Sequence, residues 1–543
     1  MLHFAEEVFF SVVLMKILVA DRISQSGVDY IKAQEGFEVI EAYGSSKEEL
    51  LKIVPDVKAI VVRSETKVDS DILAAAKELV AVGRAGVGVD NIDIDASTEA
   101  GVIVMNTPGG NTIATAELTF THMLCGARPI VQACATMREG KWDRKKFPGT
   151  ELRHKTLSIL GLGRIGSEVA KRAQAFDMKI LAYDPYLTDA RAEAMGVNSV
   201  DLPTALAQAD YITVHMPMTD STRGMINTKS ISKMKDGVRI FNCARGGIVD
   251  EEALAEGLKS GKIAAAGLDV YAEEPLDANS PLRQIPNLNL TPHLGASTLE
   301  AQESVGLEIA ESIVQVLKGG PATNAINMPT VDPATLEALK PYMALGTKLG
   351  TVLQQATTAK VDAIKITLWG PVNDLDTKPL ARAIQLGYLR HITGDSLSEV
   401  NAPAKMKELG VTVEFVKSSS EVDYTDLMEL QAVSSEGKTI TIRGTLMGKD
   451  RRMRLVGFNG REIEANIDGN LLILYNKDAP GMIGLLGTIL GKDNVNIANL
   501  TLSRAGGDGY ALTIFELDSS PSREATSEIL SNPDVENLLF VRI

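Results

Sequence analysis

The sequence contains little cysteine, no excess of basic charge and no long uncharged apolar run. Three cysteines among 543 residues do not make a disulfide framework, which fits a reducing cytosol. The net charge of −15 argues against nucleic acid or an anionic membrane surface as a partner. The chain is therefore expected to be a soluble globular protein of the cytoplasm, and its length indicates roughly three or four domains.

The first 14 residues are expected to form an extension outside the fold. Residues 8–15 are apolar, but they follow Glu6 and Glu7 rather than a basic segment. They also lack a small-residue cleavage site, so neither a signal peptide nor a membrane span is predicted. An organellar targeting remnant is less favoured, because the segment is acidic and contains no arginine. Residues 15–21 have the pattern of the first strand of the fold.

A glycine-rich motif at 161–166, GLGRIG, carries the strongest functional signal. A strand-like run at 156–160 precedes it, and a helix-forming run follows. A second strand ends on Asp184, about 20 residues after the glycines. Gly161, Gly163 and Gly166 would let backbone N–H groups approach a pyrophosphate at the helix N-terminus. Because Asp184 would accept the ribose hydroxyls and repel a 2′-phosphate, the motif predicts NAD in preference to NADP.

Strands and helices alternate from Met15 to about Met328, which predicts an α/β fold with doubly wound, Rossmann-like parallel sheets. The glycine motif comes only after residue 160, so a complete α/β unit precedes the cofactor domain. Long helical stretches near 114–140 and 301–318 bracket the motif. We expect an NAD-binding domain, residues 113–296, inserted into a discontinuous substrate-binding domain, residues 15–112 and 297–330. The active site would lie in the cleft between them.

Two further units are expected after a linker at residues 321–333. Residues 333–466 are predicted to form a separate α+β domain, in which 361–369 alternates with the period of a half-buried strand. Residues 470–543 follow the order βαββαβ of a ferredoxin-like unit. In the second helix of that unit, Ser520 is the expected N-cap, with Pro521 at the first helical position.

Three side chains that follow strand-like runs of the NAD-binding region are expected at the carboxyl edge of its sheet: Arg245, Glu274 and His293. Together they suit the oxidation of a 2-hydroxy acid. His293 would take the hydroxyl proton, Glu274 would orient the imidazole, and Arg245 would hold the substrate carboxylate. Singly, each has an ordinary alternative as a surface cation, a loop carboxylate or a structural histidine. The three in order behind a nucleotide-binding motif favour catalysis, and no metal site is predicted.

The chain resembles the D-isomer-specific 2-hydroxyacid dehydrogenases, and within them the long-form branch that oxidises 3-phosphoglycerate. The resemblance extends from Met15 to Ile543. It is carried by four motifs, GRAGVGVDN at 83–91, NTPGGN at 106–111, NCARGG at 242–247 and PHLGAST at 292–298. It implies that Arg245, Glu274 and His293 are the catalytic residues.

The resemblance also implies binding positions on both sides of the cleft. Cofactor contacts are expected at Arg164, Ile165, Asp184, Cys243, Ala244, Asp269 and Gly295. Substrate contacts are expected at Arg63, Ser64, Arg84 and Asn111, beside Arg245. A phosphorylated acid has two anionic ends and therefore needs more cations than Arg245, which Arg63 and Arg84 could supply. On position alone, either arginine could equally be a solvated or helix-capping cation.

The two C-terminal units are regulatory by the same resemblance. Residues 333–466 resemble the intervening, allosteric-substrate-binding-like domain of long-form enzymes, and 470–543 resemble an ACT domain, a module that binds amino acids. The implied effector is L-serine, and the implied effector positions are Asn476, Asp478 and Asn496. Asp478 could instead cap the helix that Pro480 opens. A homotetramer, paired through cofactor domains and ACT domains, is the expected assembly.

The resulting hypothesis is NAD-dependent oxidation of 3-phospho-D-glycerate to 3-phosphohydroxypyruvate, the first step of L-serine biosynthesis, with regulation by serine. One alternative is another acid of the same family, such as glyoxylate, hydroxypyruvate or lactate. The extra C-terminal domains and cations count against it. A second alternative, from another class, is a dinucleotide-sensing scaffold. The ACT-like segment counts against it, because such a segment favours an enzyme under metabolic feedback.

Overall fold

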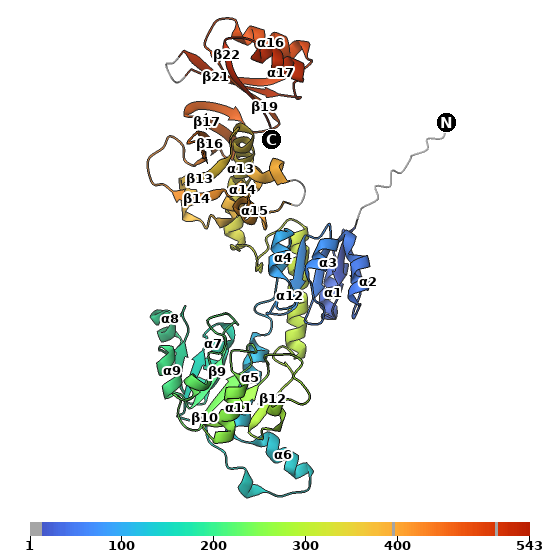
Figure 1. The fold of residues 1–543 in the computed structure, drawn as a ribbon, viewed down its shortest axis with the longest axis vertical. Helices are drawn as coiled ribbons and strands as arrows, with labels where there is room; N and C mark the ends of the chain where they lie inside the picture. The colour runs from blue at the N-terminus through green and yellow to red at the C-terminus, as the bar shows by residue number, and fades with distance from the viewer. Residues whose placement is uncertain (1–13, 394–396, 505–508) are drawn as a thin grey trace, which may run out of the picture.

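The computed structural model describes residues 14–393, 397–504 and 509–543. The predicted N-terminal extension therefore lies, apart from Leu14, outside the described residues. Four β-sheets follow one another along the chain, and they form three bodies along the long axis of the molecule (Figure 1). The first sheet lies in the middle, the second at one end, and the third and fourth at the other end (Figure 1).

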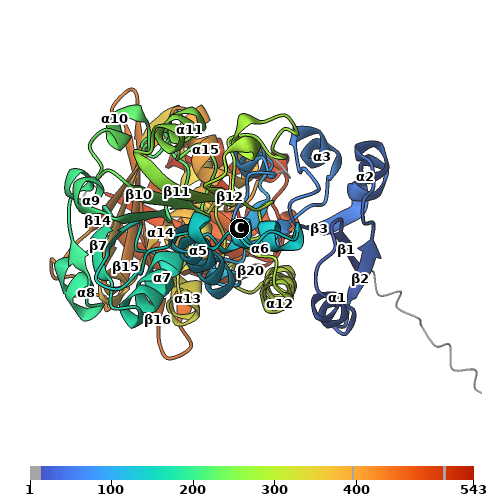
Figure 2. The ribbon, with the colours of Figure 1, turned by 90° about the horizontal axis from the view of Figure 1, so that it is seen from below.

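The first sheet is parallel and has the order β2-β1-β3-β4-β5. Its strands are β1 (Met15–Val19), β2 (Phe37–Glu41), β3 (Val57–Val62), β4 (Ala81–Arg84) and β5 (Ile103–Met105). The connecting helices are α1 (Gln25–Lys32), α2 (Lys47–Ile53), η1 (Val54–Asp56), α3 (Ser70–Ala75) and α4 (Ile94–Glu99). This sheet is seen set apart from the second one in Figure 2.

A helix from much later in the chain completes this first body. Helix α12 (Leu299–Leu317) packs on α1 and on β4, and its Ile309 and Ile313 are fully buried against the sheet. Gly27 of α1 faces Gly306 of α12. The absence of side chains there lets the two helices approach closely, since a Cβ on Gly27 would collide with the Gly306 carbonyl. The chain thus leaves the first body after β5 and returns to it through α12, as an inserted domain requires.

The second sheet is also parallel and has the order β12-β11-β10-β9-β6-β7-β8. Its strands are β6 (Thr156–Leu160), β7 (Lys179–Tyr183), β8 (Asn198–Ser199), β9 (Tyr211–Val214), β10 (Val238–Asn242), β11 (Ile263–Leu268) and β12 (Leu288–Leu290). Its helices are α5 (Thr112–Ala127), α7 (Arg164–Ala175), α8 (Asp189–Ala194), α9 (Leu202–Gln208), α10 (Thr228–Ile231), α11 (Glu251–Ser260) and η3 (Pro281–Gln284). The strand order reverses between β6 and β9, and doubly wound sheets bind ligands at such a reversal.

The predicted helical stretch at 114–140 is two helices rather than one. Helix α5 ends at Ala127, and α6 (Ile130–Arg138) begins after Pro129, followed by η2 (Arg144–Lys146). Arg128 has extended backbone angles, φ −126° and ψ 108°. A residue before proline is driven away from the helical region by the proline ring, which explains the break.

The third and fourth sheets form the C-terminal body. The third has the order β14-β13-β15-β16-β17-β18, with strands β13 (Val361–Trp369), β14 (Thr412–Lys417), β15 (Leu427–Ser434), β16 (Thr439–Met447), β17 (Arg452–Phe458) and β18 (Arg461–Asn466). Its helices are α13 (Pro333–Ala356), η4 (Pro371–Asp374), α14 (Lys378–Thr393) and α15 (Ala402–Glu408). The fourth, of order β20-β21-β19-β22, contains β19 (Asn470–Lys477), α16 (Met482–Lys492), β20 (Ile497–Ser503), β21 (Tyr510–Leu517), α17 (Arg523–Leu530) and β22 (Val535–Arg542).

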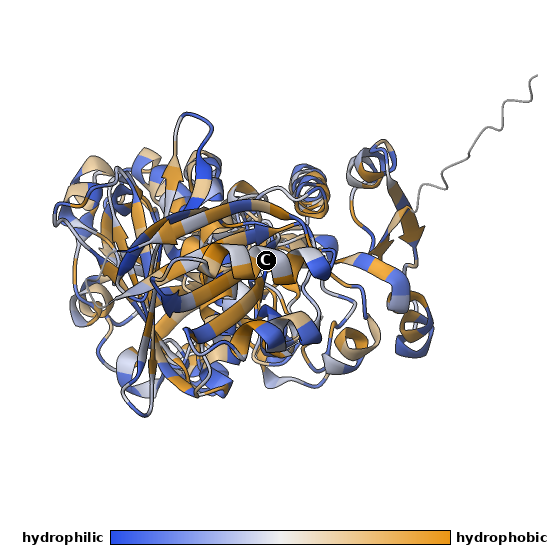
Figure 3. Cartoon of the chain, turned by 90° about the horizontal axis from the view of Figure 1, so that it is seen from above, coloured by the Kyte–Doolittle hydropathy of each residue, from blue (hydrophilic) through white to orange (hydrophobic). Residues whose placement is uncertain are grey.

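These two sheets share one hydrophobic core. Leu471, Ile473 and Ile514 of the fourth sheet belong to the same buried cluster as α13 and the strands of the third sheet. The intervening residues Leu472 and Leu474 point to the other face, where α16 and α17 cover them. Successive strand residues face opposite sides, so β19 is buried on both faces. In Figure 3 apolar residues, in orange, recur along the strands between polar ones.

The predicted fold class is confirmed. Two parallel sheets of the doubly wound type are followed by an α+β unit and by the order βαββαβ. In the last unit the N-cap of α17 is Ser522, whose hydroxyl accepts from the Ala525 N–H, so the prediction of Ser520 is wrong. None of the helices in the three described ranges combines the length and the apolar character that crossing a membrane requires.

Candidate active site

The glycine-rich loop lies between β6 and α7, at the reversal of the second sheet. Gly161 has a φ of 98°, and a Cβ there would lie 2.6 Å from the carbonyl oxygen of His215. A Cβ on Gly163 would meet none of the described atoms within 4 Å, so this glycine leaves open space. Gly163 is also the N-cap of α7, and no described side chain caps that helix. The free N–H groups of the first turn therefore fit the pyrophosphate of a dinucleotide.

Asp184, directly after β7, lies beside this loop. Its Oδ2 accepts from the Leu162 N–H at 2.8 Å, and its Oδ1 accepts from the Tyr186 N–H at 2.8 Å. A carboxylate oxygen can accept more than one hydrogen bond, so both remain able to accept from ribose hydroxyls. The position of this carboxylate at the loop suits NAD, whose ribose carries no 2′-phosphate.

His293 and Glu274 form a hydrogen-bonded pair. The distance from His293 Nδ1 to Glu274 Oε2 is 2.7 Å, and Glu274 Oε1 accepts from the Tyr271 N–H at 3.0 Å. The bond to Glu274 raises the pKa of His293. Burial pushes the pKa of Glu274 upwards, but the bonds from His293 and Tyr271 outweigh it and lower that pKa. Glu274 is thus a carboxylate, Nδ1 donates to it, and Nε2 keeps its lone pair for a substrate proton.

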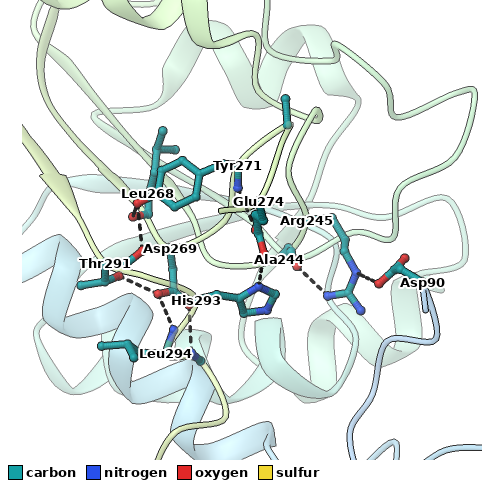
Figure 4. A network of polar contacts seen from close by, with 12 residues as sticks. Asp90, Ala244, Arg245, Leu268, Asp269, Tyr271, Glu274, Thr291, His293 and Leu294 are labelled. Carbon is teal, nitrogen blue, oxygen red and sulfur yellow. Dashed lines mark hydrogen bonds and ion pairs between the residues drawn. The ribbon is translucent and has the colours of Figure 1, made fainter. Parts of the chain in front are cut away.

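A buried carboxylate holds the turn that carries His293. Asp269 has no exposed surface; its Oδ1 accepts from the Leu294 N–H at 2.7 Å and its Oδ2 from the Gly295 N–H at 2.9 Å. Its carbonyl oxygen accepts from the N–H of His293, whose φ is 54°. Figure 4 shows His293 between Asp269 on one side and Arg245 on the other. Asp269 therefore fixes a left-handed turn that a non-glycine residue adopts only when it is held there.

Arg245, after β10, faces arginines from the first sheet. Arg245 Nε lies 3.5 Å from Asp90 Oδ2, and Arg84 Nη1 lies 3.9 Å from the same oxygen. Gly88 sits between the two guanidinium groups, where a Cβ would collide with Arg245. Burial, and after it repulsion from Arg245 and Arg63, lower the pKa of Arg84, while Asp90 opposes the shift. The three predicted arginines are therefore close enough to interact across the cleft.

A cleft of about 490 Å³ lies between the glycine-rich loop, Arg245 and His293. From the predicted set it is lined by Asn111, Gly163, Arg164, Ile165, Cys243, Ala244, Arg245, His293 and Gly295. Arg164 also donates to the Pro108 carbonyl at 3.3 Å, which links α7 to the segment after β5. Burial raises the pKa of Cys243 to about 12, so this residue contributes packing rather than a thiolate. Within the described ranges no three His, Cys, Asp or Glu side chains cluster as a metal site requires.

Comparisons with known proteins agree with this geometry. Residues 120–295 match the family model of the D-isomer specific 2-hydroxyacid dehydrogenase NAD-binding domain, and residues 338–459 match that of the D-3-phosphoglycerate dehydrogenase intervening domain. A D-3-phosphoglycerate dehydrogenase of Archaeoglobus fulgidus is 43% identical over 97% of this chain and 100% of its own length. One from Synechocystis is 40% identical over 99% of this chain and 96% of its own.

The chain belongs to the D-isomer specific 2-hydroxyacid dehydrogenases. Its intervening domain and nearly full-length relatives place it with the long members of that family, and it is an NAD-dependent oxidoreductase. A crystal structure of a glyoxylate reductase from Paecilomyes thermophila is 32% identical, with a TM-score of 0.54, and covers 58% of this chain and 98% of its own. That similarity covers little more than half of this 2-hydroxyacid dehydrogenase.

Among the residues described, the predicted substrate residues Arg63, Ser64 and Arg84 do not line this cleft. Arg63 follows β3, and its N–H donates to the buried Asp21 at 2.7 Å. Its carbonyl accepts from Arg84 Nε at 3.1 Å and from Asn91 at 2.8 Å. Ser64 is exposed in the same loop. This network of backbone contacts positions the loop after β3 beside Arg84.

The predicted effector residues of this dehydrogenase already have side-chain partners within the chain. Asn476 is buried and its Oδ1 accepts from the Thr513 hydroxyl at 3.0 Å. Asp478 forms an ion pair of 3.2 Å with Arg504, and Asn496 donates to Asp518 at 2.7 Å. Asp478 does not cap α16, whose N-cap is Gly481. Each of the three has an intrachain contact of its own.

Sequence reasoning missed two residues at this site. Asp90, which bridges the arginines, stands in the motif at 83–91 and could have been singled out as its only acidic residue. His122 lies in the middle of α5, is 4% exposed and contacts Thr291 near Asp269. No sequence signal marks His122, because its partner is 169 residues away.

Proposed function

We propose that this chain oxidises the 2-hydroxyl group of 3-phosphoglycerate to the ketone, giving 3-phosphohydroxypyruvate, the first step of L-serine biosynthesis. The observation that carries the proposal is the His293–Glu274 pair at 2.7 Å beside a cleft that His293 and Arg245 line, with Arg84 next to Arg245 through their shared neighbour Asp90. The long D-3-phosphoglycerate dehydrogenases that this chain matches over 97–99% of its length support the choice of substrate.

His293 acts as the base in the direction of oxidation. Its Nε2 takes the hydroxyl proton as the carbinol carbon gives up a hydride, for which bound NAD supplies the acceptor. The imidazolium that forms is stabilised by Glu274, which already holds Nδ1–H. In the reverse direction the same imidazolium returns the proton to the substrate oxygen.

The arginines supply the charge that a doubly anionic substrate needs. Arg245 is suited to hold the carboxylate beside His293, since both side chains line the cleft. Nη1 of Arg84 is buried and has no hydrogen-bond partner in the described parts of the chain. A buried donor without a hydrogen bond is costly, and the ion pair of this nitrogen with Asp90 is long at 3.9 Å, so an anionic substrate group that bonds to it gains free energy. Arg63 is the candidate for a second contact to the phosphate.

The test is NADH oxidation with 3-phosphohydroxypyruvate as substrate. We expect turnover by the wild type and a loss of about 10²- to 10⁴-fold in His293→Ala, because a general acid is removed. His391→Ala is the matched control, since His391 is exposed on α14 in the C-terminal body. Reduction of glyoxylate or hydroxypyruvate, but not of the phosphorylated acid, would contradict the proposed substrate. Dinucleotide binding without any turnover would favour a sensing scaffold.

We propose further that the protein is a cytoplasmic homotetramer inhibited by L-serine. The ferredoxin-like fourth unit supports an effector role, and the low cysteine content supports a reducing compartment. Serine would have to displace Arg504 from Asp478 to bind at the predicted positions. Serine titration of the turnover assay, with the mass in solution measured alongside, tests both statements. Turnover that is unchanged by millimolar serine contradicts the effector proposal.

A further inference from the structure

A buried histidine behind the active site is joined to the catalytic turn by a chain of hydrogen bonds. His122 lies on α5 with its Nδ1 against Gly267 of β11, where a Cβ would be 2.6 Å from that nitrogen. Its Nε2 lies 2.9 Å from the hydroxyl of Thr291. Gly267 therefore provides the space that lets the imidazole reach Thr291.

The direction of these hydrogen bonds follows from the chemistry of the groups. The Thr291 hydroxyl lies 2.6 Å from Asp269 Oδ1, and a carboxylate can only accept, so the hydroxyl donates its single proton there. Toward His122 the hydroxyl must therefore accept, which requires a proton on Nε2. Burial lowers the pKa of His122, against the charge of Asp269, and so keeps the ring neutral. His122 is thus the neutral tautomer with Nε2–H.

The chain ends on the atoms that hold the catalytic turn. Asp269 accepts from the Leu294 and Gly295 N–H groups through its carboxylate and from the His293 N–H through its carbonyl. Its buried charge is met by these short bonds and by the Thr291 hydroxyl. If the Thr291 hydroxyl donated elsewhere, the buried Asp269 carboxylate would keep only two of its three donors, and its position under the turn would be less firmly fixed.

We propose that His122 is a positioning residue for catalysis: by donating to Thr291 it commits the Thr291 hydroxyl to Asp269 and so holds the turn that carries His293. The inference rests on the proposed function for its kinetic test. It assigns no contact with substrate to His122. It also predicts that Thr291 and His122 act as one unit.

The test compares three replacements of His122. An amide at the end of glutamine can donate from about the place of Nε2, whereas asparagine is too short and leucine cannot donate. We expect His122→Leu and His122→Asn to lower kcat by up to about 100-fold, with little change in KM for 3-phosphohydroxypyruvate, because a misplaced catalytic group costs rate rather than binding. His122→Gln should restore most of the loss. Equal losses in all three variants would indicate packing alone and overturn the proposal.

A second measurement needs no turnover. The chain has six histidines, so their imidazole signals can be followed by NMR in histidine-labelled protein. The groups that face His293 are Glu274 and Asp269, which raise its pKa, and Arg245, which lowers it. If Asp269 swings away in His122→Leu, the titration midpoint of His293 should move to lower pH. An unchanged midpoint overturns the inference.

Thr291→Val provides the matching change at the other end of the chain. Valine keeps the shape but removes the hydroxyl, so it should lower kcat as His122→Leu does. The double variant should be no worse than either single one, since residues of one network are not additive. Additive losses would contradict a shared role. If the wild type reduces no 2-oxo acid, the proposed function fails, whereas the His293 titration still decides this inference.

Discussion

The catalytic cleft and the fourth sheet differ in whether their polar side chains already have partners within the chain. Oδ1 of Asn111 in the cleft and Nη1 of Arg84 beside it are buried without a hydrogen-bond partner among the described residues. In the fourth sheet, Asn476, Asp478 and Asn496 each contact another side chain. A polar ligand would satisfy groups in the cleft, but at the fourth sheet it must first displace partners. Residue type alone therefore does not make a binding site.

Among the variants that test this comparison, Glu274→Gln at the cleft should have the largest effect. Glutamine cannot stabilise the imidazolium, so we expect a loss of about 10²-fold or more in kcat/KM. Reduction needs protonated His293 and is lost as pH rises through its pKa. Since Glu274 raises that pKa, the falling limb of the pH profile should move to lower pH in the variant. Glu273→Gln, its exposed neighbour, is the control, and an unmoved limb would contradict the pairing.

In the C-terminal body, Ile514→Ala tests the shared core. Ile514 is fully buried in the cluster that joins the third and fourth sheets, so its truncation should cost about 2–5 kcal/mol. The chain has two tryptophans, and in a Trp142→Phe background Trp369 of the third sheet is the reporter. We expect the denaturant midpoint of Trp369 fluorescence to fall. The exposed Ile483→Ala should leave it unchanged.

If Ile514→Ala leaves the denaturant midpoint of Trp369 fluorescence unchanged, the third and fourth sheets do not unfold as one body. The two sheets would then unfold independently, although they pack against each other.

Arg84→Ala sharpens the comparison on the side of the cleft. Losing a charged hydrogen bond to the substrate should raise KM for 3-phosphohydroxypyruvate by about 10- to 100-fold, with a smaller change in kcat. Hydroxypyruvate has the carboxylate of the substrate but not its phosphate, so it distinguishes binding of one group from binding of the other. If Arg84 binds the phosphate, KM for hydroxypyruvate should not change. Arg153→Ala, which removes only a surface ion pair with Asp177, is the control, and an equal KM in both variants would exclude Arg84 from binding.

The smallest change in stability is expected from Asp478→Ala. The Asp478 and Arg504 side chains are 35% and 72% exposed, and such surface pairs contribute about 0–1 kcal/mol. The thermal midpoint should therefore stay close to that of the wild type, while inhibition by serine should be lost. Asp534→Ala, which removes a surface contact with Lys477, is the control. Retained inhibition in Asp478→Ala would place the effector elsewhere.

Local pattern was sufficient for much of the fold. The strands at 156–160 and 361–369 have the predicted bounds, because each is an apolar or alternating run between turn residues. The N-cap of α17 was missed because Ser520 and Ser522 are chemically equivalent candidates. The N–H of Ser522 is held by Asp493 at 2.6 Å, a contact made 29 residues away. Such a contact selects one of two equivalent caps and has no local signal.

The candidate site shows the same division. Arg245, Glu274 and His293 could be proposed from residue type and order, because hydride transfer from a hydroxy acid needs a base, its partner and a cation. The prediction could not decide whether Arg63 and Arg84 face the cleft. The positions of Asp90 and Gly88 beside both guanidinium groups show that Arg84 approaches Arg245.

The sequence by itself determined the strands, the glycine loop and the types of the catalytic groups, since these depend on neighbours within a few residues. Only the tertiary structure decided which polar groups remain without partners, which sheets share a core and how His122 reaches Asp269 through Thr291. These properties depend on side chains far apart in the chain, whose contacts exist only after the elements have packed.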